Sequence, residues 1–129
     1  MSSASLILLD AHPALAAEES FLPAEKRLSG NPKQTLWMQY TDPSGRFFVG
    51  VWRSEPGKWR VAYTEEEWCE MLAGRSIVTD ETGHAVELKA GDCFVVPRGF
   101  AGTWEVVETS LKRFVVYEPG ACSTPPAPA

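Results

Sequence analysis

Two segments of the sequence decide the fold: Glu67-Trp-Cys-Glu-Met-Leu-Ala-Gly74 and Gly91-Asp-Cys-Phe-Val-Val-Pro97-Arg-Gly99. In the first segment, a carboxylate is followed seven residues later by a glycine. In the second, a short apolar run lies between a Gly-Asp turn and a Pro-x-Gly turn. Each segment is typical of a strand that ends in a turn. Both lie within residues 59–100, so we expect a small β-barrel to be organised around this stretch.

The rest of the chain repeats the pattern of short apolar runs that alternate with turn sequences. Strands are predicted over residues 5–9, 36–40, 46–53, 58–63, 66–72, 75–79, 84–89, 93–96, 102–108 and 111–117. Asp42-Pro-Ser-Gly45 is one of the turn sequences between them. No segment has enough periodic apolar residues for a long helix. Evenly spaced short strands indicate an all-β, antiparallel jelly-roll barrel. Side chains either fill the interior of such a barrel or leave it open as a pocket.

The chain is long enough, at 129 residues, for one domain with a core of its own. We expect three parts. Residues 1–35 form an N-terminal arm, in which residues 14–20 or 24–28 could each make one helical turn. Residues 36–118 form the barrel domain, and residues 119–129 form a flexible C-terminal tail.

Composition restricts the partners and the compartment. The net charge of −5 argues against nucleic acid, because phosphate binding needs a basic patch. No stretch approaches the length of a membrane span, and the apolar run at residues 6–9 lacks the preceding basic residue of a secretion signal. Three cysteines without a close pair indicate neither disulfides nor a zinc knuckle, and Cys69 and Cys93 are expected as small buried residues. We expect a cytoplasmic protein with a small-molecule ligand.

Several short pieces, taken in their order and spacing, resemble a cupin, and within the cupins the single-domain ureidoglycine aminohydrolase-type family. The pieces are Gly50-Val-Trp52, Pro56-Gly57-Lys58-Trp59, Glu67-x-Cys69 with Leu72-x-Gly74, Gly91-Asp92, Pro97-x-Gly99 and Gly102-x-Trp104-Glu105. They lie within residues 36–117, which is the whole predicted barrel. Because cupins commonly pair, the resemblance implies a homodimer, in which residues 5–9 add to the partner's sheet edge.

The usual cupin pattern carries a metal site: two His separated by one residue, then a Glu, and a third His just after the Pro-x-Gly turn. Glu67 stands at the Glu position. The His pair is replaced by Val61 and Tyr63, or in the alternative register by Arg60 and Ala62, and the third His is replaced by Gly102.

One carboxylate alone does not hold a catalytic divalent ion, since zinc, for example, takes three protein ligands in such sites. The two histidines of the chain, His12 and His84, are expected at the surface and not as ligands. We therefore expect neither a metal nor another cofactor. A divalent ion held through Glu67 is the less favoured alternative.

Side chains two apart on a strand share a face, so Glu67 and Cys69 face the interior together if the motif holds. Alternation leaves the direction of Lys112 open, and the resemblance favours the interior. The expected cavity lining is Trp52, Tyr63, Glu67, Cys69, Trp104 and Lys112, with Phe100 at the mouth. Such an aromatic cavity with an acid, a base and a thiol suits a small polar ligand that carries an amide, amine or carboxylate.

Three functions are compatible with these residues. The first is a metal-free cupin that binds a small polar organic ligand. The second is an enzyme of the aminohydrolase, isomerase or lyase type, with Glu67 as general acid or base and Lys112 or Tyr63 as its partner. The third is a closed, packed barrel with a structural role, in which Glu67 is a buried carboxylate paired for structural reasons and Cys69 is a packing residue.

Overall fold

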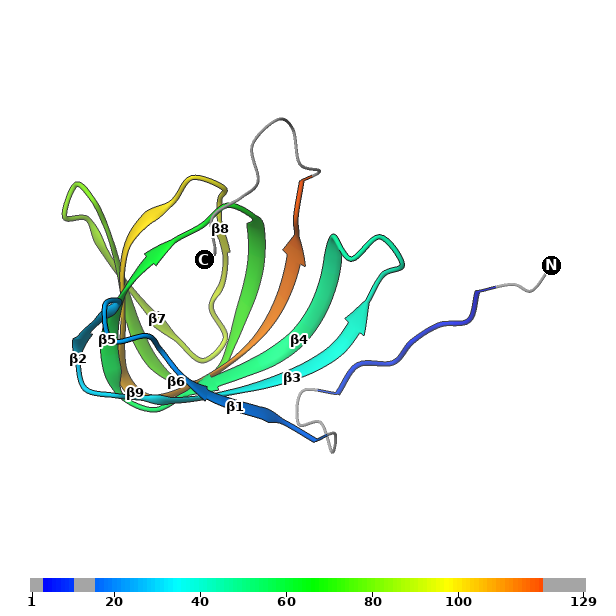
Figure 1. Cartoon of the computed structure of the whole chain (residues 1–129), viewed down its shortest axis with the longest axis horizontal. Coiled ribbons are helices and arrows are strands. Elements are labelled where there is room, and N and C mark those ends of the chain that lie inside the picture. The colour runs from blue at the N-terminus through cyan, green and yellow to red at the C-terminus, as the bar shows by residue number, and fades with distance from the viewer. Residues whose placement is uncertain (1–3, 11–15, 120–129) are drawn as a thin grey trace.

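The computed structural model describes residues 4–10 and 16–119, and the nine strands within them form one curved antiparallel sheet (Figure 1). The strands are β1 (Glu18–Phe21), β2 (Arg27–Ser29), β3 (Lys33–Thr41), β4 (Phe47–Ser54), β5 (Gly57–Ala62), β6 (Glu66–Asp80), β7 (Ala85–Lys89), β8 (Cys93–Val96) and β9 (Ala101–Tyr117). Within the described residues there is no helix long and apolar enough to cross a membrane. The all-β antiparallel prediction is confirmed, with the sheet curled into half a barrel as in a jelly roll.

Strand β9 organises the sheet because it pairs along both of its edges. One edge pairs with β4 through residues 110–117 and with β5 through residues 101–106. The other edge pairs with β6 along most of its length. From these strands the sheet continues to β3 and β1, to β2, and to β7 and β8. Side chains on the inner side therefore converge from strands that are far apart in the sequence.

Two predicted pairs of strands are each one continuous strand. The merged ranges are 66–72 with 75–79 in β6, and 102–108 with 111–117 in β9. The break expected at Gly74 is a shift of register inside β6 and not a turn. Gly74 has a φ of 82°, and a Cβ there would overlap the carbonyl oxygen of Thr109 on β9. Only glycine fits this point of the ladder.

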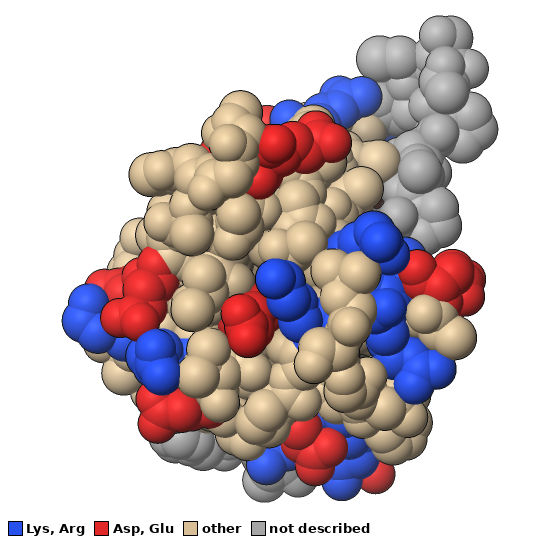
Figure 2. All heavy atoms as spheres, turned by 90° about the vertical axis from the view of Figure 1, so that its left-hand side faces the viewer, with Lys and Arg blue, Asp and Glu red and all other residues tan. Residues whose placement is uncertain are grey.

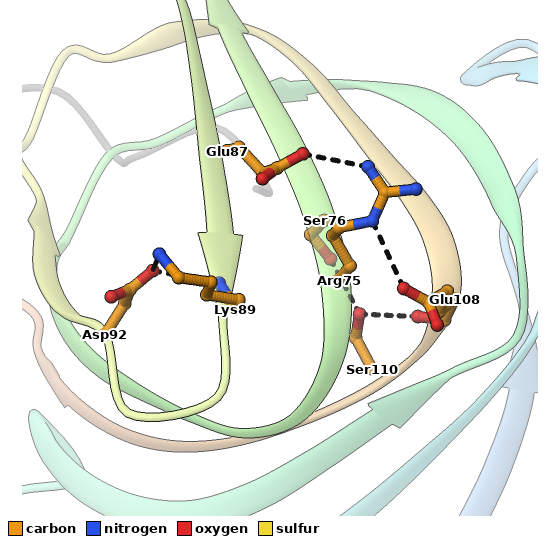
Figure 3. A network of polar contacts seen from close by, with 7 residues as sticks. All are labelled: Arg75, Ser76, Glu87, Lys89, Asp92, Glu108 and Ser110. Carbon is orange, nitrogen blue, oxygen red and sulfur yellow. Dashed lines mark hydrogen bonds and ion pairs between the residues drawn. The ribbon is translucent and has the colours of Figure 1, made fainter.

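The register shift changes which residues of β6 face the interior. Glu67, Cys69 and Met71 are buried before the shift, and Ser76 is buried after it. The hydroxyls of Ser76 and Ser110 form a hydrogen bond of 2.8 Å at this place, between β6 and β9 (Figure 3). The period of two therefore holds within each half of β6, but not across Gly74.

Arg75 lies beside this shift and joins three strands through exposed ion pairs (Figure 3). Its Nη1 lies 2.8 Å from a carboxylate oxygen of Glu87 on β7, and its Nε lies 3.1 Å from one of Glu108 on β9. Lys89 and Asp92 form a further exposed pair at 3.7 Å across the turn after β7. Exposed pairs of this kind contribute little to stability, roughly 0–1 kcal/mol each.

The strand predicted at residues 5–9 is wrong: this segment is described but pairs with no described strand. Figure 1 shows it running away from the sheet, and the side chains of Leu6 and Leu8 are 95% and 93% exposed. Strands form instead at β1, which pairs with β3, and at β2, which pairs with β5. Their pairing comes from edges that the barrel offers and not from apolar alternation, which both segments lack.

Neither expected helical turn is helical in the residues that the structure describes. In the segment 24–28, residues 24–26 are a turn closed by the Lys26 amide, which donates to the Pro23 carbonyl at 3.0 Å, and residues 27 and 28 belong to β2. Residues 18–20 of the other segment belong to β1. Residues 11–15, which include His12, and the tail residues 120–129 lie outside the described residues.

Two hydrophobic clusters fill the inner side of the sheet. The first is built from Trp59, Met71, Leu88, Val96, Trp104 and Val106, and the second from Cys69, Phe114 and Val116. Trp52 and Phe94 pack against both clusters and connect them. The expectation that Cys93 is buried is wrong, because this residue begins β8 on the outward phase and is exposed.

Candidate functional site

A cavity of about 210 Å³ lies on the inner side of the sheet. Its lining is Leu22, Lys26, Gln34, Leu36, Trp52, Trp59, Arg60, Val61, Tyr63, Glu65, Glu67, Trp104, Lys112, Phe114 and Val116. These side chains come from β3, β4, β5, β6 and β9 and from the connections next to β2 and β6. The barrel interior is therefore left open as a pocket, which is one of the two arrangements that the sequence allowed.

A buried ion pair lies at the cavity wall. The Nζ of Lys112 on β9 is 3.1 Å from Oε2 of Glu67 on β6, and the two side chains are only 6% and 9% exposed. The same ammonium lies 4.8 Å from the ring centroid of Trp52 and 4.4 Å from that of Trp104. It is thus held by a carboxylate and by two indole rings, which attract a cation through their negative faces.

The other polar groups around the pair keep their protons at neutral pH. The Cys69 Sγ donates to Oε2 of Glu67 at 3.4 Å, and burial raises the pKa of this thiol to about 12. Burial also raises the pKa of Tyr63 above its usual value. Burial alone would lower the pKa of Lys112. Its neighbours Cys69, Glu67 and Tyr63 raise this pKa by more than burial lowers it, so the net direction is upward. The site therefore presents hydrogen-bond donors and not a thiolate or a free amine.

Glu65 lies at the cavity lining and is only partly exposed to solvent. Partial burial, together with the charges of Glu118 and Glu67, raises its pKa to about 6. A hydrogen bond of 3.4 Å from the hydroxyl of Thr64 works in the opposite direction. Glu65 therefore gains its proton, and loses its negative charge, at a pH only slightly below neutral.

Two nitrogen donors near the cavity have no hydrogen-bond partner among the described residues. The indole Nε1 of Trp52 donates to Oε1 of Gln34 at 3.4 Å, which leaves the Gln34 Nε2 buried and unpaired. The indole Nε1 of Trp104 is likewise buried and unpaired. Buried donors without partners are unusual in folded proteins.

The structure places five of the seven expected site residues at the cavity lining. They are Trp52, Tyr63, Glu67, Trp104 and Lys112. Cys69 is fully buried behind the lining, where its Sγ donates to Glu67 and its side chain packs with Phe114 and Val116. Phe100 does not line this cavity: its ring packs against that of Tyr63 at 6.3 Å between centroids, and it lines a second cavity.

The second cavity has a volume of about 200 Å³ and is mostly apolar. Its lining is Val78, Asp80, His84, Val86, Leu88, Phe94, Val95, Val96 and Phe100. His84 is exposed at its edge, next to the turn between β6 and β7. The second cavity lies apart from the Glu67–Lys112 pair and shares no lining residue with the first cavity.

Sequence reasoning missed the part of the lining that comes from early in the chain. Leu22, Lys26 and Gln34 fall within residues 1–35, which we expected to form an arm. A signal for Gln34 was available, because β3 begins at Lys33 and extends the predicted strand 36–40 backwards without a break. Leu22 and Lys26 follow β1 and precede β2, two short strands with no apolar alternation to reveal them.

The residues around Glu67 do not fit the metal ion that the cupin pattern implies. Val61 has no donor atom, and Gly102 has no space for a side chain, because a Cβ there would overlap the carbonyl oxygen of Thr79. The carboxylate of Glu67 already faces the ammonium of Lys112, which would repel a divalent ion. In the described part of the chain, no three His, Cys, Asp or Glu side chains are grouped so that they could hold a metal.

Comparison with known proteins agrees with this architecture. A family described as the EutQ-like cupin domain matches residues 41–114. The chain is similar in structure to a Pseudomonas syringae pv. tomato protein of unknown function from the DUF861 family, with a TM-score of 0.75 and 21% identity over 84% of this chain and 46% of that one. The Clostridium difficile EutQ protein gives a TM-score of 0.61 and 16% identity over 67% of this chain and 64% of that one.

A third similar structure is the cupin domain of Schizosaccharomyces pombe Cnp3, with a TM-score of 0.58 and 16% identity over 66% of this chain and 64% of that one. The chain thus spans less than two thirds of each of these three structures, and about half of the first. At such identities the likeness concerns the fold alone. No curated protein matches the sequence.

Proposed function

This chain belongs to the EutQ-like cupin domain family, and on that premise we propose that it binds a small polar organic ligand in its barrel without a metal ion. The observation that carries the proposal is the cavity of about 210 Å³ with a buried ion pair in its wall. A mostly apolar cavity with a few convergent polar groups is typical of a small-molecule site. Its volume is below the roughly 300–1,000 Å³ of pockets for drug-sized molecules, so the ligand is small.

The metal-free part of the proposal is supported by Lys112. Its ammonium lies beside Glu67, where it supplies the positive charge that a metal ion would otherwise bring. We expect elemental analysis of protein purified without added metal to find manganese, iron, nickel and zinc well below one ion per chain. Tightly bound metal at one ion per chain would contradict this part of the proposal.

Ligand binding is tested by a fragment screen on the ¹⁵N-labelled protein, read from the indole N–H signals of Trp52 and Trp104. We expect small polar fragments to shift these two signals. The matched variants are Val61→Phe, which fills the cavity from β5, and Val95→Phe, which adds the same ring on the outward side of β8. Binding should be lost in the first variant and kept in the second. A screen in which no fragment moves these signals would contradict the proposed function.

An enzyme is the second candidate, favoured by the convergence of Glu67, Lys112 and Tyr63 on one cavity. An aminohydrolase related to the ureidoglycine type, an isomerase or a lyase would each use Glu67 to accept a proton. Tyr63 and Lys112 keep their protons and serve as donors, and Oε2 of Glu67 is already engaged by two donors. Binding is therefore better supported than proton transfer. If a turned-over substrate is found, Glu67→Gln should abolish turnover, and an unchanged rate would exclude this mechanism.

We also propose the cytoplasm as the place of action. The support is chemical: Cys69 and Cys93 are free thiols, and Cys93 is exposed. An exposed thiol persists more readily where the surroundings are reducing.

A further inference from the structure

The Glu67–Lys112 pair restricts the charge of the ligand, an inference that rests on the proposed function. A carboxylate and two indole faces are the groups with which proteins recognise an ammonium ion. Here the protein's own Lys112 occupies that place, between Glu67, Trp52 and Trp104. A ligand amine would find these groups already engaged and would meet a like charge in a setting with little water. The cavity is therefore unsuited to a cation.

The remaining polar groups favour a ligand that accepts hydrogen bonds. The Gln34 Nε2 is a buried donor without a partner at the cavity lining, and Tyr63 keeps its phenolic proton there. The ammonium of Lys112 also lines the cavity. Two carboxylates, Glu65 and Glu67, line it as well, and Glu67 is neutralised by Lys112.

Cations outnumber acidic residues on the groove next to the cavity. A groove of about 620 Å³ shares the lining residues Lys26, Arg60 and Val61 with the cavity, and Lys58 adds a further cation. In the part of the chain that the structure describes, neither Lys58 nor Arg60 is in an ion pair; Arg60 donates to the Glu25 carbonyl at 3.4 Å, which leaves its charge in place. Asp80 and Glu81 lie on the groove as its acidic residues.

Figure 2 shows the face of the molecule on which β2 and β5 lie, with Lys and Arg side chains gathered on one part of it and mixed charges elsewhere. An excess of one charge at the entrance of a cleft raises the local concentration of the opposite ion, and Lys26, Lys58 and Arg60 outnumber Asp80 and Glu81 on the groove. A small anion would thus be drawn toward the entrance and would find donors inside.

We propose that the cavity takes a small carboxylate and excludes the amine of the same shape, because Lys112 fills the cation-binding place and leaves donors for an anion. Charge selection then depends on one residue. With Lys112→Met, the carboxylate of Glu67 and the rings of Trp52 and Trp104 become available to a ligand ammonium, so the preference should reverse.

The test uses two sets of matched probes: benzoate, benzamide and benzylamine, and the smaller propionate, propionamide and propylamine. Titrations are followed on the indole signals of Trp52 and Trp104. In the wild type we expect a carboxylate to bind on the order of tenfold more tightly than its amide, the gain of a charge-assisted hydrogen bond, and its amine to cause no shift. In Lys112→Met the amine should bind more tightly than the carboxylate.

Two rim variants keep the test independent of the folding of Lys112→Met. Arg60→Gln and Lys58→Gln should weaken carboxylate binding severalfold and leave amide binding unchanged, and the effect should shrink at high salt. Lys89→Gln, which removes an exposed cation away from the groove, is the matched control and should change neither.

An amide or amine that binds as tightly as its carboxylate in the wild type would overturn the inference and leave the proposed function standing. The inference would also be wrong if none of the six probes shifted the two indole signals. The proposed function fails only if the wider fragment screen is empty too.

Discussion

The buried positions of Lys112 and Glu67 are not explained by protein stability alone. Moving both charges out of water costs several kcal/mol per ion, and an apolar pair of similar volume is often as stable or more stable. The aromatic rings and the thiol of Cys69 lower this cost but leave the pair in the wall of a cavity. Its position there is better explained by what it presents to a ligand.

Removing one partner of this pair should be far more damaging than removing both. We expect Lys112→Met, which leaves the carboxylate of Glu67 buried and unpaired, to cost about 3–5 kcal/mol of unfolding free energy in urea titrations. Lys112→Met combined with Glu67→Leu should recover most of the loss. Arg75→Gln, which removes the exposed pairs of Arg75 with Glu87 and Glu108 in Figure 3, is the control at roughly 0–2 kcal/mol. A Lys112→Met loss no larger than this control would show that the pair is not buried.

Glu65 should make the stability of the protein depend on pH between about 4.5 and 6. Its pKa is raised in the folded state, so the folded state holds the proton more tightly than the unfolded chain. The resulting penalty is absent below about 4.5, grows as the pH rises, and is complete above about 6.

The measurement is the melting temperature of Glu65→Gln relative to the wild type from pH 4 to 8, a range chosen roughly to bracket this interval. The variant should be the more stable protein at neutral pH, and its advantage should vanish toward pH 4. Glu81→Gln, in the exposed turn after β6, is the matched control. A constant difference across the whole range would contradict the prediction.

At the scale of elements, the long strands β6 and β9 determine where the site residues lie. The sequence predicts their parts as four strands. In β6 the predicted break is at Gly74, across which the period of two fails, and in β9 it is at residues 109–110. The structure keeps the chain in the ladder by a shift of register. A pattern of residue types reveals the glycine but not whether the backbone continues or turns, since that depends on the partner strand.

Gly74→Ala should therefore destabilise the whole sheet and not only one turn. A Cβ at Gly74 meets the backbone of Thr109 on β9, in addition to the positive φ. Gly83→Ala is the matched control, because Gly83 has a φ of 91° with open space around it, and its cost is limited to about 1–2 kcal/mol. Urea unfolding should show a clearly larger loss for Gly74→Ala. Equal losses would mean that β9 moves aside without cost.

At the scale of the molecule, we propose that a second copy of the chain covers the N-terminal segment. Leu6 and Leu8 are almost fully exposed on a segment that runs away from the sheet, and outward apolar residues on β6 and β8, Trp68 and Val95, are 38% and 58% exposed. Exposed apolar surface of this kind favours association. The segment and the edge of another copy's sheet are suited to each other.

Sedimentation velocity should then give twice the 14.2 kDa mass of one chain, and deletion of residues 1–10 should weaken this association. Leu6→Ser with Leu8→Ser, which keeps the length of the segment, should have a similar effect. An unchanged dimer after the deletion would exclude an exchange of the segment, and a monomeric full chain would exclude the dimer.

The sequence predicted the fold and five of the cavity-lining residues because both follow local rules: turn residues, alternation along a strand, and a recurring spacing of glycines. It missed Gln34 because the predicted strand 36–40 began too late, although β3 runs on without a break from Lys33. It missed Lys26 because this residue precedes β2, a short strand that pairs with an edge present only once the barrel has formed. It also gave no sign that the Lys112 ammonium would lie between two indoles, since that depends on distances between β4, β6 and β9.

The double pairing of β9 has a consequence for synthesis on the ribosome. Strands β4, β5 and β6 leave the exit tunnel before their common neighbour, so none of the ladders that join them to β9 can form until residues 101–117 have emerged. During the same interval Glu67 has no ion-pair partner, because Lys112 lies on β9. Nascent chains that stall before this strand would expose open edges and an unmatched carboxylate together, and they would be natural clients for chaperones.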